Sequence, residues 1–78
     1  MYWWYKLLEK NGDVYRYAYS RESDICDGII VYSATTQTAI IEKVSKTDRT
    51  RWEQQKSLEH FSKVIKEGFP KQRQVCCG

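Results

Sequence analysis

The chain has 78 residues, of which 41% are hydrophobic, 14% aromatic and 29% charged, and its formal net charge is +3. This length allows one domain, and the apolar content excludes a wholly disordered chain. No apolar run approaches the roughly 18 residues of a membrane-spanning helix. The chain has three cysteines, an odd number, which argues against a disulfide framework. Together these features predict a soluble protein of a reducing compartment, the cytoplasm, with no membrane partner.

The first predicted element is a β-hairpin formed by residues 3–10 and 13–20. Asn11-Gly12 fits a two-residue turn with positive φ angles, and β-prone residues flank it on both sides. Such a turn places Lys10 opposite Asp13. Because alternate side chains of a strand point to opposite faces, this register divides the hairpin into two sets. One set contains Trp3, Tyr5, Leu7, Val14 and Ala18; the other contains Trp4, Leu8, Tyr15, Tyr17 and Tyr19, with Lys6 and Lys10 among them.

A second hairpin is predicted after a polar loop. Gly28 precedes the β-branched run of residues 29–33, and a turn-like polar stretch separates it from a fourth strand over residues 38–44. Both strands contain adjacent apolar residues, so their periodicity does not show which face is buried.

One helix follows, and both of its ends are marked in the sequence. Thr50 and Glu53 match a capping box, in which each side chain binds a backbone N–H of the other residue. Gly68 suits the left-handed position after the last turn, and Pro70 prevents the helix from continuing. Apolar residues recur between these ends at helical spacing, namely Trp52, Leu58, Phe61, Val64 and Ile65.

These elements predict an α+β fold, in which two hairpins form an antiparallel four-stranded sheet, arranged as a meander, with the helix packed on one face. The domain is expected to span residues 1–70, and residues 71–78 are expected to form a flexible basic tail that carries two cysteines. We expect the set containing Trp3 and Tyr5 to face the helix, because this choice keeps Lys6 and Lys10 out of the core.

One helix covers only one face of such a sheet, so the second set of the first hairpin would remain exposed. Exposed apolar patches of this size commonly mark an interaction site. The sequence therefore favours a non-catalytic protein-interaction module, a homodimer or a partner-binding domain. Its predicted contact residues are Trp4, Leu8, Tyr15, Tyr17 and Tyr19.

Two alternatives remain open at this point. Aromatic and basic residues on a sheet are typical of domains that bind single-stranded nucleic acid. Residues 1–42 carry four basic and six acidic side chains, whereas residues 43–78 carry nine basic and four acidic ones, so the basic charge lies mainly outside the first hairpin. The adjacent Cys76 and Cys77 suggest a thiol-redox or soft-metal site, although their spacing does not suit tetrahedral zinc.

No motif indicates catalysis. The sequence contains no glycine-rich phosphate loop, no nucleophile elbow and no informative pair of carboxylates, and a chain this short has little room for a pocket. We therefore expect neither an enzyme nor a resident cofactor.

Overall fold

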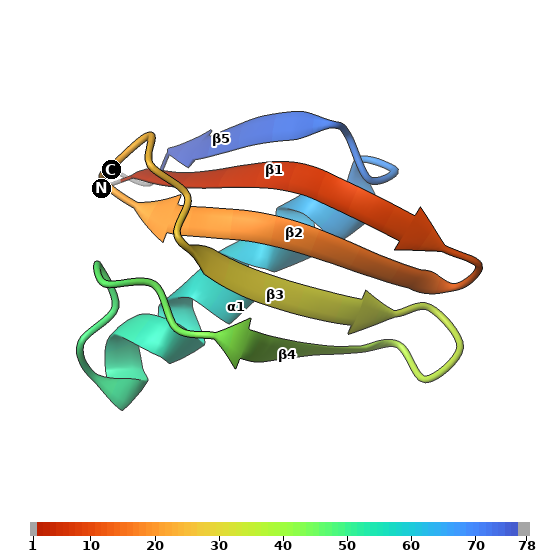
Figure 1. Ribbon diagram of the computed structural model, residues 1–78, viewed down its shortest axis with the longest axis horizontal. Coiled ribbons are helices and arrows are strands. Elements are labelled where there is room, and N and C mark those ends of the chain that lie inside the picture. The colour runs from red at the N-terminus through yellow and green to blue at the C-terminus, as the bar shows by residue number, and fades with distance from the viewer. Residues whose placement is uncertain (1, 77–78) are drawn as a thin grey trace.

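The computed structural model describes residues 2–76, which form a five-stranded antiparallel sheet with one helix packed on one face (Figure 1). The elements are β1 (Tyr2–Asn11), β2 (Val14–Arg21), β3 (Gly28–Ser33), β4 (Thr38–Lys43), α1 (Arg51–Lys66) and β5 (Gln72–Cys76). The sheet order is β4-β3-β2-β1-β5. The first four strands form a meander, and α1 then crosses the sheet so that β5 lies beside β1. The predicted α+β class is confirmed, but the sheet has five strands rather than four.

The extra strand corrects the prediction of a flexible tail. Residues 72–76 pair antiparallel with β1, and Val75, opposite Trp3, is buried. The chain reverses after α1 through left-handed backbone at Gly68 (φ 80°) and Phe69 (φ 59°). Because β5 is short and mostly polar, it has little strand signal of its own, and its pairing with β1 depends on the tertiary fold.

The register of the first hairpin differs from the predicted one. Asn11 pairs with Val14, so the turn residues are Gly12 and Asp13. A β-bulge between Leu7 and Glu9 then shifts the register once more along β1. The turn changes each cross-strand partner by two residues and so keeps the faces, whereas the one-residue bulge exchanges the faces of β1 and β2 relative to each other.

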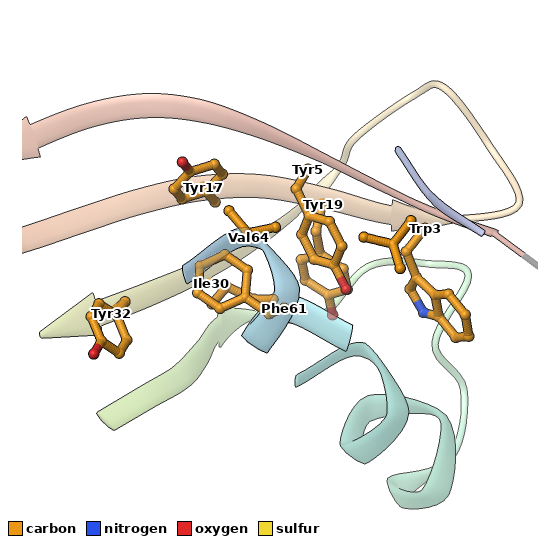
Figure 2. Packing of buried hydrophobic residues seen from close by; sticks show 9 residues of the cluster. Trp3, Tyr5, Tyr17, Tyr19, Ile30, Tyr32, Phe61 and Val64 are labelled. Carbon is orange, nitrogen blue, oxygen red and sulfur yellow. The ribbon is translucent and has the colours of Figure 1, made fainter. Parts of the chain in front are cut away.

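This register places the tyrosines of β2 in the core. Tyr5 pairs with Tyr19, and Leu7 pairs with Tyr17, so these side chains share the face that α1 covers. The predicted grouping of Val14 and Ala18 with Tyr5 is therefore wrong. The buried core consists of Trp3, Tyr5, Tyr17, Tyr19, Ile30, Tyr32, Phe61, Val64 and Val75 (Figure 2).

The helix matches its predicted ends. The Thr50 hydroxyl accepts a hydrogen bond from the Glu53 backbone N–H (3.2 Å), and the Glu53 carboxylate accepts one from the Thr50 N–H (2.9 Å). Phe61 and Val64 point into the core, whereas Trp52, predicted to be buried, is 60% exposed.

Among residues 2–76, no helix is long and apolar enough to cross a membrane.

Candidate functional site

The sheet face away from α1, here called the open face, is the main candidate site. In Figure 1 the helix lies behind the sheet, so this face is turned toward the viewer. Trp3 and Tyr5 point toward α1, and the residues that alternate with them point to the open side. Following this alternation across the paired strands, the apolar residues of the open face are Tyr2, Trp4, Val14, Ala18, Ile29, Val31 and Ile40.

The loop of residues 22–27 covers one end of the open face. It joins β2 to β3 and crosses the sheet near the chain ends (Figure 1). Ser20, beneath this loop, is fully buried, and its hydroxyl donates a hydrogen bond to the Ser23 carbonyl. The Cys26 sulfur lies 4.0 Å from the Trp4 carbonyl oxygen. The part of the open face that remains accessible is therefore its middle and the end near the β1–β2 turn.

Charged side chains of both signs lie in the middle of the open face. The Arg16 guanidinium lies 2.5 Å from a Glu42 carboxylate oxygen and 3.6 Å from a Glu9 carboxylate oxygen. Lys6 and Lys43, which lie in the same cross-strand row as Ala18 and Ile29, are the other basic residues of this face. A shallow hollow of about 360 Å³ accompanies the ion pairs and is lined by Glu9, Asn11, Val14, Arg16, Val31 and Glu42.

The five predicted contact residues do not form one surface. Trp4 lies on the open face, where its ring meets Tyr2 edge-on at 6.4 Å. Leu8 is 54% exposed at the bulge of β1. Tyr15 packs instead on the helix side of the sheet, where its ring stacks on Phe69 at 3.8 Å.

Tyr17 and Tyr19 are fully buried under α1, which excludes them from any contact surface of the folded chain. The Tyr17 hydroxyl donates to the Pro70 carbonyl (2.6 Å), and the Tyr19 hydroxyl accepts from the Ser45 N–H (3.1 Å). Burial raises the pKa of each of these hydroxyls to about 12. The sequence did not identify three residues of the open face, Ile29, Val31 and Ile40. Adjacent apolar residues in β3 and β4 did not show which side of each strand is buried.

A buried polar cluster lies at the N-terminal end of α1. The Asp48 side chain is fully buried, and its carboxylate accepts from the Ser57 hydroxyl (2.6 Å), which accepts in turn from the Trp3 indole N–H (3.0 Å). The Arg21 guanidinium lies 3.5 Å from Asp48 and also binds Glu53. Burial raises the pKa of Asp48, although the surrounding donors oppose the shift. Because this carboxylate is enclosed, the cluster joins the helix to the sheet and offers nothing to a substrate.

Asp48→Ala should lower the free energy of unfolding by about 2–3 kcal/mol, because the buried Ser57 hydroxyl and the Arg21 guanidinium would lose an acceptor. Urea unfolding followed by circular dichroism measures this loss. Asp24→Ala removes an exposed carboxylate and should change stability by less than about 0.5 kcal/mol. Equal stability of both variants would show that the cluster contributes nothing to the fold.

The predicted thiol site is only partly described. Cys76 is exposed at the end of β5, opposite Tyr2, and Cys77 lies outside the described residues. Within residues 2–76, no three His, Cys, Asp or Glu side chains are placed to hold a metal ion together.

No protein-family model, curated protein or solved structure is significantly similar to this chain. The clues to function are therefore the surfaces of the fold itself. The open face is the broadest of them, because it extends over all five strands.

Proposed function

We propose that the protein is a non-catalytic interaction module of the cytoplasm that self-associates through the open face. The observation that carries this proposal is an apolar sheet face that no second helix covers. Trp4 and Tyr2 are half-buried there, and Ile40 is 60% exposed. Apolar side chains arranged across neighbouring strands are the usual material of sheet-to-sheet packing.

The charges of the open face favour a second copy as the occupant. Lys6, Arg16 and Lys43 lie there with Glu9 and Glu42, so the face carries both signs of charge and a net charge of 3 − 2 = +1. In a two-fold dimer, the same surface meets itself, and a pattern of mixed sign lets basic residues of one copy approach acidic residues of the other. A nucleic-acid surface needs an excess of basic residues, so the alternative of single-stranded nucleic acid has weaker support.

The size of the open face sets the expected affinity. Five strands spaced about 4.8 Å apart, each about six residues long, cover on the order of 500 Å² in projection. Stable interfaces bury about 800 Å² of accessible surface on each partner. The dimer should therefore lie at the weak end of specific interfaces, and its population should depend on protein concentration.

Sedimentation equilibrium under reducing conditions tests this proposal. The mass of the wild-type protein should rise from monomer toward dimer with concentration, and Trp4→Asp should weaken association at least about tenfold, because a desolvated carboxylate would face the partner. Trp52→Asp is the matched control, since Trp52 is a large exposed side chain on the opposite side of the molecule.

Thermal unfolding by circular dichroism should show that both variants remain folded. A wild-type protein that stays monomeric at millimolar concentration would overturn the proposal. Equal dimerisation of wild-type protein and Trp4→Asp would place the interface elsewhere.

A further inference from the structure

The outer edge of β4 is a second surface with distinct chemistry. β4 is the last strand of the sheet and pairs only with β3 among residues 2–76. Its outer backbone N–H and C=O groups are therefore available to another strand. Proline and inward-pointing charges commonly block such edges. The first four residues of β4 contain neither, since they are Thr38, Ala39, Ile40 and Ile41.

A groove of about 450 Å³ runs beside this edge, between β4 and the N-terminal half of α1. Figure 1 shows the N-terminal end of α1 extending past β4 in this view. The groove is lined by Ala39, Ile40 and Ile41 from β4 and by Arg51, Gln54, Gln55 and Leu58 from α1. Ile41 and Leu58 are half-buried and pack against the core, so they give the groove an apolar floor. Arg51 is exposed at its helical end.

We propose that this edge binds an extended, acidic segment of another polypeptide as a sixth strand. The unpaired backbone of β4 requires an extended occupant, because only a strand presents N–H and C=O groups at matching intervals. Alternate side chains of that strand would point to the helix side of the sheet. On that side, an apolar side chain fits the groove floor at Leu58. A carboxylate two residues along the strand lies on the same side and fits Arg51.

The charge of the groove favours an acidic partner over a second copy. Within residues 2–76, Arg51 forms no ion pair, and the start of a helix adds further positive potential. A second copy pairing through β4 would present Ala39 and Ile41 to the groove and bring another Arg51 toward it. The Glu42 carboxylate of that copy would not offset the positive charge of the second Arg51, because Glu42 points to the open face and binds Arg16. This site goes beyond the proposed self-association, which uses a different surface.

A capped six-residue peptide, Val-Thr-Glu-Thr-Val-Thr, is the probe, because its valine and glutamate side chains lie on one face of the strand and its threonines on the other. Its addition to isotope-labelled protein should shift the backbone amide resonances of residues 38–43 and of the groove residues of α1. The same peptide with lysine in place of glutamate should bind about threefold more weakly, because it loses the attraction to Arg51. A version that is N-methylated at alternate amides should not bind, because it cannot complete the strand hydrogen bonds.

Arg51→Glu tests the charge selection directly. This substitution lies at the first turn of α1, where an acidic residue is favourable, so the fold should persist. It should reverse the preference from the glutamate peptide to the lysine peptide, whereas Lys63→Glu, at an exposed position in the last turn of the helix, should leave the preference unchanged.

Several results would overturn the proposal. They are the absence of shifts at millimolar peptide, shifts confined to other elements, and equal binding of the N-methylated peptide. Concentration-dependent shifts of the groove residues of α1 without any peptide, which the open-face dimer would not produce, would show that a second copy occupies the edge instead.

Discussion

Phe61→Ala should leave the protein largely unfolded at 25 °C. Phe61 is fully buried, and its ring centroid lies 5.5 Å from that of Tyr5, 5.2 Å from Tyr17 and 6.4 Å from Tyr32. Removing such a side chain costs about 3–5 kcal/mol, which combines lost apolar transfer with an unfilled cavity. A domain of this size has a total stability of only about 5 kcal/mol, so the variant retains little or none of it.

Trp52→Ala is the control for this prediction. The helical spacing of the sequence predicts both side chains to be buried, yet Trp52 is 60% exposed, and the Lys56 ammonium lies 5.6 Å from its ring centroid. Its removal should cost less than about 1 kcal/mol. Urea unfolding of the two variants measures the difference. Similar losses would mean that Phe61 does not occupy the centre of the core.

The helix was predictable from sequence because its signals are local. The capping box of Thr50 and Glu53 and the left-handed Gly68 depend on residues within one turn of one another, and each lies where expected. Trp52 is the exception. It fits the apolar period, but α1 starts near the sheet edge, so its first turn has little sheet beneath it (Figure 1).

The faces of the sheet were not predictable, because they depend on the register. The turn uses Gly12-Asp13 in place of Asn11-Gly12, which moves the pairing by two residues, and the bulge after Leu7 moves it back by one. Only the one-residue shift of the bulge changes which side chains share a face, and the sequence carries no local mark of the bulge. The predicted contact surface was therefore assembled from residues of both faces, whereas its underlying premise, a sheet with one helix and one uncovered face, holds.

Alkaline pH should unfold the protein in a single cooperative step. Burial raises the pKa of Tyr17 and Tyr19 to about 12, and burial together with the nearby Asp48 carboxylate raises that of Tyr5 still further. The unfolded chain releases these protons near pH 10, about the ordinary pKa of tyrosine. The stabilising contribution is therefore complete below about pH 10 and is lost as the pH rises through about 12.

The hydrogen bonds of Tyr5 and Tyr17 act in the same direction as burial, because both hydroxyls are donors. Tyr5 donates to the Ser57 carbonyl at 2.7 Å, and Tyr17 donates to the Pro70 carbonyl at 2.6 Å. Ionisation would remove both donors and place a negative charge against each carbonyl oxygen. Above pH 10, each tyrosine lowers the free energy of unfolding by up to about 1.4 kcal/mol per pH unit, so the three together lower it by up to about 4 kcal/mol per pH unit.

Tyrosinate absorbance and the helical circular dichroism signal, recorded together during a pH titration, measure this coupling. Most of the absorbance change of the buried tyrosines should coincide with loss of the helical signal. Tyr17→Phe should lower the free energy of unfolding by about 1 kcal/mol at neutral pH, because the Pro70 carbonyl loses its donor. It should also reduce the number of protons released on alkaline unfolding by about one. Ionisation of all tyrosines in a protein that keeps its helix would contradict the burial of this triad, and with it the assignment of the β2 tyrosines to the face beneath α1.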